Sequence, residues 1–154
     1  MPILWRISNY TSLSGDGGML YAGRWHTPGR RIIYLAESPA GALIETLVHL
    51  ELDETRLPRS YKLLEIDVPD AIKIESIEMP TSNRWKSHIE TTQRAGNQWL
   101  QAAKTALARV PSAITPNTWN VLLNPDHPEA QHIQILKVVV AEYDQRLLPG
   151  IRSR

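Results

Sequence analysis

The distribution of apolar and polar residues along the chain predicts a series of short strands. Each predicted strand is rich in β-branched or aliphatic residues and is bounded by turn-forming residues such as Gly, Pro, Ser or Asp. These segments are 3–8, 31–36, 61–69, 109–114 and 119–123, with an extended continuation at 71–77. The longest apolar run, 133–144, predicts the central strand of a sheet.

Two segments have the residue spacing of helices. Ser38 followed by Pro39 is typical of a helix start, because the hydroxyl caps free backbone N–H groups and proline suits the first helical position. An apolar stripe then predicts a helix to about Leu50; its members are Ala40, Leu43, Ile44, Leu47 and Val48. Residues 84–107 predict a second helical region that breaks near Gly96.

The order of these elements indicates the fold class. Segment 9–18 predicts a loop, 19–25 a short extended piece, and the prolines within 124–130 a tight connection. Strands and helices follow neither a regular βαβ alternation nor a sandwich pattern, so we expect a mixed α+β fold with flanking helices. A length of 154 residues without a linker or repeat predicts a single domain over residues 1–154.

Composition and charge exclude several classes of function. The net charge is +1, with 17 basic and 16 acidic residues interspersed, so the basic patch of a nucleic-acid-binding protein is missing. The absence of cysteine excludes disulfides, thiol nucleophiles and Cys-ligated metals, and the five histidines do not form a metal-binding motif. No signal peptide and no apolar run of about 18 residues is present, which predicts a cytoplasmic protein without a membrane span.

The segment 22–38 carries the first candidate functional residues. Arg24 lies in a Gly- and Pro-rich turn, where it could bind a phosphate through two N–H groups or stack on Trp25 at the surface. Tyr34 shares a strand face with Ile32 and Ala36. Its ring could face a flat ligand, or it could be a core tyrosine with a satisfied hydroxyl.

Glu45 is the third candidate. On the predicted helix it lies roughly 130° from the centre of the apolar stripe, on the same flank as Gly41. Glycine inside a helix costs about 1 kcal/mol relative to alanine, which a closely approaching ligand or backbone would explain. The alternative is a solvated pair of Glu45 with His49, worth about 0.3–0.5 kcal/mol.

Several motifs in order give the chain a resemblance to a known family. "LWRIS" (4–8), "GRW" (23–25) and "YLAES" (34–38) are followed by "ALIETLVHL", "VPSAI" and "LLNPDHP". Together these motifs resemble the RES domain family, the toxins of bacterial toxin–antitoxin pairs, over nearly the whole chain. The resemblance implies a fold related to the ADP-ribosyltransferase toxins, with an Arg-Tyr-Glu group in an NAD cleft.

The resemblance also implies roles for individual residues. Arg24, Tyr34 and Glu45 would form the catalytic group, without a metal ion. The residues that would contact the substrate are Arg6, Arg24, Tyr34, Ser112 and Asn124. The sequence departs from the family at His26, where asparagine is expected, so the resemblance assigns position 26 no role.

The activity that the resemblance implies is cleavage of the nicotinamide–ribose bond of NAD, by hydrolysis or by phosphorolysis. NAD would be the substrate, and no cofactor is expected. The alternatives are transfer of ADP-ribose to a cellular protein and, in a different class, a non-catalytic binding domain. The implied partner is a co-encoded helix-turn-helix antitoxin of the Xre type, through which contact with DNA would be indirect. A homodimer is a further expectation.

Overall fold

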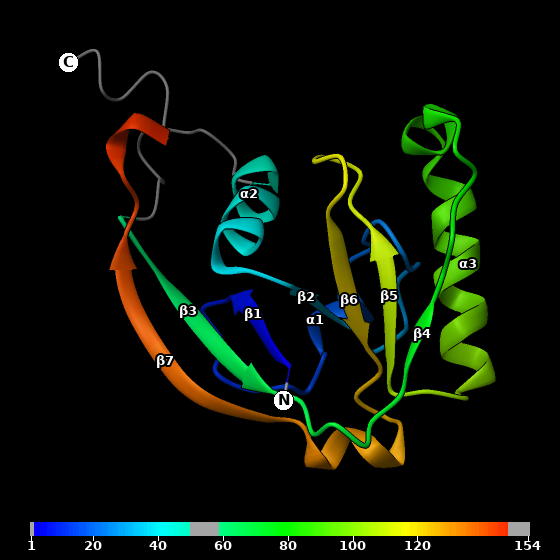
Figure 1. The fold of residues 1–154 in the computed structure, drawn as a ribbon, viewed down its shortest axis with the longest axis horizontal. Helices are drawn as coiled ribbons and strands as arrows, with labels where there is room; N and C mark the ends of the chain where they lie inside the picture. The colour runs from blue at the N-terminus through cyan, green and yellow to red at the C-terminus, as the bar shows by residue number, and fades with distance from the viewer. Residues whose placement is uncertain (1, 50–58, 148–154) are drawn as a thin grey trace.

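A computed structural model of the chain describes residues 2–49 and 59–147 (Figure 1). Seven strands form one sheet in the order β4-β5-β6-β2-β1-β3-β7. The strands are β1 (Ile3–Ile7), β2 (Ile33–Ala36), β3 (Ser60–Asp67), β4 (Ile74–Ser76), β5 (Leu107–Pro111), β6 (Trp119–Leu123) and β7 (Gln134–Glu142). All neighbouring strands are antiparallel except β4 and β5, which are parallel. The sheet and its helices confirm the predicted mixed α+β class.

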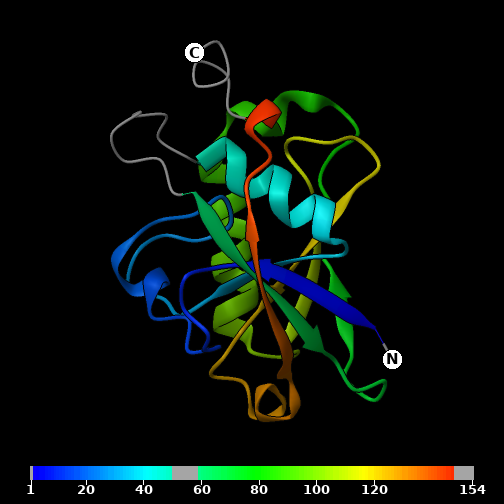
Figure 2. The same ribbon diagram turned by 90° about the vertical axis from the view of Figure 1, so that its left-hand side faces the viewer.

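The helical segments lie at the periphery of the sheet. The α-helices are α1 (Gly17–Leu20), α2 (Pro39–His49) and α3 (Ile89–Ala102). The 3₁₀ helices are η1 (Asn83–Ser87), η2 (Pro128–His132) and η3 (Gln145–Leu147). Figure 1 shows α3 running beside β4 and β5, and Figures 1 and 2 show α2 near one end of the sheet. Among the strands, α2 packs mainly against β1 and β2.

The sheet has two faces, because successive side chains of a strand point in opposite directions. On the face that we call the α3 face, Tyr34 lies opposite Leu122, and Asn120 lies opposite both Ala36 and Val110. Part of this face packs in a cluster with Trp99 of α3; the other buried members are Trp25, Ile32, Trp85, Ala108, Val110 and Leu122. The α3 face therefore carries both apolar packing and polar side chains.

The opposite face of the sheet forms the larger core. Its buried members come from both halves of the sheet and from the connecting segments; among them are Leu4, Ile33, Leu35, Leu64, Ile66, Leu107, Val121 and Leu123. Burial of a side chain of this size contributes about 1.5–3 kcal/mol relative to leaving it exposed. This core holds together the strands from which the candidate site is built.

The start of α2 agrees with the sequence prediction. The Ser38 hydroxyl accepts the N–H of Gly41 at 2.9 Å, and the Ser38 carbonyl accepts the N–H of Ala42 at 3.0 Å. This capping fixes the first helical turn and so sets the direction of residues further along α2. The helix is described as far as His49, and the predicted end at Leu50 lies outside the described residues.

The prediction that residues 133–144 form a central strand was wrong in its position. The strand itself exists as β7, but within the described ranges it pairs with β3 alone and lies at the edge of the sheet. Leu136, Val138 and Val140 remain 57, 39 and 68% exposed. A continuous apolar run indicates a strand, but it does not reveal whether a second neighbour covers the other edge.

Three further predictions need correction. The helical region 84–107 does not break near Gly96: η1 ends at Ser87, α3 runs unbroken from Ile89 through Gly96 to Ala102, and β5 begins at Leu107. Gly96 is tolerated within the helix because Trp25 packs directly against it. The structure has the short helix α1 at Gly17–Leu20, where a loop over 9–18 and an extended piece over 19–25 were predicted.

Candidate active site

Glu45 joins three separate elements of the fold. Its Oε1 atom accepts a hydrogen bond from the Ser112 hydroxyl at 2.9 Å and another from the Asn120 side-chain amide at 2.7 Å. Glu45 comes from α2, Ser112 follows the end of β5, and Asn120 is the second residue of β6. Two donors on one oxygen restrict the rotation of the carboxylate.

The direction of the Ser112 hydroxyl is fixed by its backbone neighbours. Ser112 is only 4% exposed, and its oxygen accepts the N–H groups of Ile114 and Thr115, each at 3.1 Å. Because these two bonds occupy acceptor positions of the oxygen, the hydroxyl hydrogen is free to point toward Glu45. The turn after β5 therefore pre-orients one of the two donors to Glu45.

Tyr34 lies on β2 with its hydroxyl in a hydrogen-bonded pair. The hydroxyl oxygen accepts the backbone N–H of Trp25 at 3.1 Å and lies 2.6 Å from Nδ1 of His26. Burial raises the pKa of the Tyr34 phenol, and the nearby positive charge of Arg24 opposes this rise. The hydroxyl is therefore neutral and available as a donor at physiological pH.

Arg24 lies in a short turn that we call the arginine turn, residues 23–26. The turn is closed by a hydrogen bond from the Gly23 N–H to the His26 carbonyl at 3.1 Å. The Arg24 guanidinium donates through Nη1 to the carbonyl of Lys86, which follows Trp85 in η1, at 2.9 Å. This contact uses one of the five N–H donors of the guanidinium.

Side chains of α3 hold the backbone of the arginine turn. Thr92 donates its hydroxyl hydrogen to the Arg24 carbonyl, and Gln93 donates its amide to the Gly23 carbonyl at 3.1 Å. One helical turn further on, Asn97 accepts the N–H of Thr27 at 3.2 Å and donates to the Thr27 hydroxyl at 3.0 Å. Buried backbone groups of the turn are satisfied in this way without a regular strand partner.

The register of the sheet relates Tyr34 to the Glu45 group. Tyr34 lies opposite Leu122 on β6, and Asn120 is the next residue of β6 on the same face. One such step along a strand is about 7 Å. Asn120, which contacts Glu45, and Tyr34, whose hydroxyl contacts the arginine turn, therefore lie about one such step apart on the α3 face.

Two predicted site residues do not join this group. Arg6 lies opposite Leu64, whose buried side chain belongs to the opposite face of the sheet, and it donates to the Ser12 carbonyl at 3.4 Å. Burial lowers the pKa of the Arg6 guanidinium. Asn124 lies four residues beyond Asn120, past the far end of β6, where its side chain accepts the N–H of Asp126 at 3.0 Å. Asn124 thus shapes the turn after β6.

Two polar residues of the site did not emerge from the sequence patterns. Asn120 could have been noticed as a polar residue in the otherwise apolar strand 119–123, but its contact with Glu45 spans 75 residues of chain. His26 has no sequence signal that links it to Tyr34. Both depend on the pairing of distant segments, which local periodicity does not contain.

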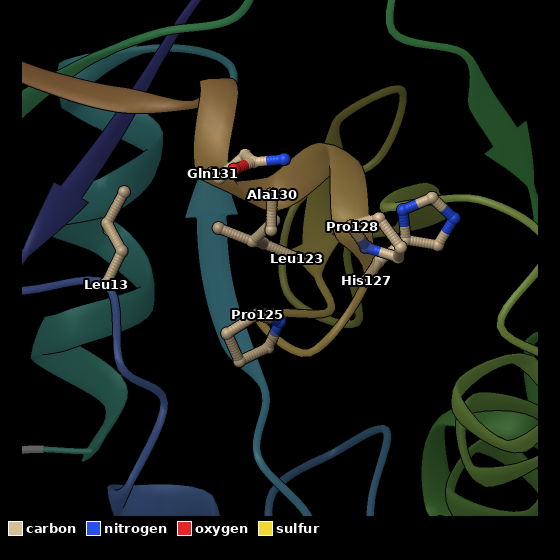
Figure 3. Close-up of a pocket in the computed structure, with 7 residues that line it drawn as sticks. All are labelled: Leu13, Leu123, Pro125, His127, Pro128, Ala130 and Gln131. Carbon is tan, nitrogen blue, oxygen red and sulfur yellow. The ribbon is translucent and has the colours of Figure 1, made fainter.

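A cavity of about 390 Å³ lies away from this group (Figure 3). It is lined by Leu13, Leu123, Pro125, His127, Pro128, Ala130 and Gln131. Leu123 points to the opposite face, and Nδ1 of His127 is engaged by the Glu129 N–H at 3.1 Å. Over the described ranges 2–49 and 59–147, no cluster of three or more His, Asp or Glu side chains could hold a metal ion. No helix in these ranges is long and apolar enough to cross a membrane.

Comparisons with known proteins identify the fold and the family. The fold is similar to a chain of the M. tuberculosis MbcT–MbcA toxin–antitoxin complex, with a TM-score of 0.72, 18% identity, and coverage of 99% of this chain and 89% of that chain. The RES domain model matches residues 3–146. The chain belongs to the RES domain toxin family.

Curated relatives agree with this assignment. A protein of Pseudomonas putida named Toxin Res is 46% identical over 134 residues, which cover 86% of this chain and 91% of the relative. The Prs ADP-ribosylating toxin of a Sphingobium species is 39% identical over 142 residues, with coverage of 88 and 86%. A Toxin Res of Photorhabdus laumondii is 38% identical over 130 residues, with coverage of 80 and 81%.

Proposed function

We propose that this protein is an enzyme that cleaves the bond between nicotinamide and ribose in NAD. The observation that supports this most strongly is the fixed carboxylate of Glu45 on the same face as Tyr34 and the arginine turn. The site offers a negative group, an aromatic ring and a guanidinium. NAD offers a developing cation, flat rings and a pyrophosphate that match these groups.

The reaction suits a site without a metal ion. As the N–C1′ bond breaks, its electron pair moves to the pyridinium ring, which leaves as neutral nicotinamide, and positive charge develops on the ribose. Glu45 would stabilise that charge, while Ser112 and Asn120 keep its Oε1 atom in place. The oxygen of water or of phosphate then forms a bond to C1′. In hydrolysis the attacking water releases one proton to the solvent.

Arg24 and Tyr34 would bind the parts of NAD that do not react. The Nη1 contact with Lys86 leaves further N–H donors of Arg24 for the pyrophosphate, which a guanidinium binds through two parallel hydrogen bonds. The Tyr34 hydroxyl is engaged within the protein, so this residue would contact NAD through its ring. Binding of the pyrophosphate by Arg24 and contact with the ring of Tyr34 would hold the ribose with its C1′ atom beside Glu45.

Transfer of ADP-ribose to a protein is the second candidate activity. It is favoured by the 39% identical relative that is named an ADP-ribosylating toxin. Bond breakage at C1′ would be the same, and a nucleophile of the acceptor protein would replace water or phosphate. The two activities therefore differ in what reaches C1′ after nicotinamide leaves.

One experiment separates these outcomes. Purified protein is incubated with NAD in water, with phosphate, and with a cell lysate, and the products are identified by chromatography and mass spectrometry. ADP-ribose indicates hydrolysis, ADP-ribose 1″-phosphate indicates phosphorolysis, and a protein carrying ADP-ribose indicates transfer. The proposed function would be refuted if NAD stays intact in all three incubations and no protein carries ADP-ribose.

The proposed role as a toxin includes a partner. We infer an antitoxin partner, because the fold matches a chain of a toxin–antitoxin complex. From the family resemblance we infer that this antitoxin is co-encoded and of the Xre type, and that the enzyme is cytoplasmic. We also infer a homodimer on the resemblance alone. Light scattering of the purified chain, with and without the co-expressed product of the neighbouring gene, measures the mass of both assemblies. A chain that is monomeric and does not bind that product would contradict both inferences.

A further inference from the structure

His26, the last residue of the arginine turn, contacts Tyr34 and has no assigned role. Its side chain is only 3% exposed. Nε2 lies 2.8 Å from the Tyr21 carbonyl, and Nδ1 lies 2.6 Å from the Tyr34 hydroxyl. Because a carbonyl can only accept, Nε2 carries the hydrogen, and Nδ1 of the neutral ring is left as an acceptor.

The hydrogen of the Tyr34 hydroxyl is therefore directed at His26. With that hydrogen committed, the hydroxyl oxygen presents a lone pair to the Trp25 N–H, 3.1 Å away. Trp25 directly follows Arg24, so this chain of hydrogen bonds runs from the Tyr21 carbonyl to the backbone of the arginine turn. Burial lowers the pKa of His26, which favours the neutral ring that the chain requires.

Two glycines make room for this arrangement. A Cβ at Gly23 would overlap the Tyr34 hydroxyl and lie 2.9 Å from Cε1 of His26. A Cβ at Gly18 would overlap the Arg30 carbonyl oxygen and lie 3.2 Å from Nε2 of His26. The backbone thus approaches the imidazole closely from two sides, which indicates a built contact rather than a loosely packed side chain.

We propose that His26 is a positioning residue: it orients the Tyr34 hydroxyl, which in turn anchors the backbone that carries Arg24. This inference rests on the proposed function for its consequence in catalysis. It assigns the Tyr34 hydroxyl to the protein and leaves the ring of Tyr34 for the substrate. It also makes the position of the Arg24 guanidinium depend on the acceptor at Nδ1 of His26.

Asparagine and glutamine provide a matched pair of substitutions at this position. The Oδ1 atom of asparagine can replace Nδ1, so His26→Asn retains an acceptor for the Tyr34 hydroxyl but loses the bond to Tyr21. The amide nitrogen of glutamine can replace Nε2, so His26→Gln retains the bond to Tyr21 but no longer places an acceptor at the position of Nδ1. Both variants remove the ring, so their loss of packing is comparable.

The test is steady-state release of nicotinamide by the full chain, with unfolding temperature measured in parallel. We expect His26→Gln to raise KM by about 10- to 100-fold, because a shift of about 1 Å in a binding group costs this much. His26→Asn should raise KM far less. In a Tyr34→Phe background, the two substitutions should become equivalent. A purely structural role predicts a smaller active fraction, hence lower kcat at unchanged KM, and this result would overturn the inference.

A second measurement keeps the inference independent of the activity. Nitrogen NMR of the His26 ring should show hydrogen on Nε2 alone and a change at Nδ1 in the Tyr34→Phe variant. A Nδ1 signal that is the same in wild type and Tyr34→Phe would refute the hydrogen-bonded pair, whatever the enzyme does with NAD. A correct ring signal together with intact NAD would instead refute the proposed function and the catalytic part of this inference.

Discussion

Replacement of Gly96 by alanine tests whether α3 sets the position of the arginine turn. A Cβ at this position would overlap the carbonyl oxygen of Trp25 and lie 2.8 Å from its carbonyl carbon, whereas ordinary contacts begin at 3.4 Å. The Trp25 carbonyl belongs to the backbone, so relief requires movement of the arginine turn or of α3. The displacement needed is on the order of 1 Å, because interiors are packed too densely to absorb the methyl group.

The expected effects on stability and activity follow from this displacement. Alanine gains about 1 kcal/mol of helix propensity, while overpacking costs about 1–3 kcal/mol, so the net loss of unfolding free energy is up to about 2 kcal/mol. A 1 Å shift of Arg24 should lower kcat/KM for nicotinamide release by about 100-fold. The loss of activity should thus exceed what the fraction of unfolded protein explains.

Denaturant unfolding and nicotinamide release, measured on the same preparation, test this prediction. Gly17→Ala is the matched control, because a Cβ at Gly17 would have no neighbour within 4 Å. We expect the control to be as active as the wild type. A Gly96→Ala variant with wild-type stability and wild-type kcat/KM would refute the argument that α3 positions Arg24.

Three further outcomes are expected. Asn124→Ala should lower the unfolding free energy by about 1 kcal/mol, because the hydrogen bond from the Asp126 N–H is lost. The value of kcat/KM per folded molecule should stay unchanged, and a 10-fold loss of kcat/KM would show that Asn124 belongs to the active site. Asn120→Ala should lower kcat/KM by about 10-fold or more, because Glu45 loses one of two donors, and kinetics at the wild-type level would contradict this. The pKa of His26 is lowered in the folded chain, so below about pH 6.5 the unfolded chain binds a proton that the folded chain excludes. The unfolding free energy should therefore decrease as the pH is lowered below about 6.5, by at most about 1.4 kcal/mol per pH unit. Denaturant titrations should show a shallower fall in His26→Asn, and equal slopes would refute this.

Local features of the fold could be predicted from the sequence. The Ser38-Pro39 start of α2 depends on capping within four residues, and the structure places it as expected. Most strands also follow from local apolar patterns bounded by turn residues. The edge position of β7 did not follow, because neighbours in a sheet are chosen by long-range pairing. The role of Gly96 likewise depends on Trp25, which is 71 positions earlier in the chain.

The candidate site was predictable only in part. The motif resemblance points to Arg24, Tyr34 and Glu45, and the sheet register places Tyr34 near Asn120, which contacts Glu45. The donors that orient them come from distant segments: Asn120 contacts Glu45 across 75 residues, and α3 contacts the arginine turn across 68–70 residues. Such contacts require the three-dimensional structure, because no periodicity in the sequence records them.

The most direct test of the central claim is nicotinamide release from NAD by wild-type protein and by Glu45→Gln. Glutamine keeps the size of the side chain and can still accept hydrogen bonds from Ser112 and Asn120, but it removes the negative charge. We expect a loss in kcat of at least about 100-fold with little change in unfolding temperature, because the charge acts on the developing ribose cation. Nicotinamide release by Glu45→Gln at the wild-type rate would contradict the account.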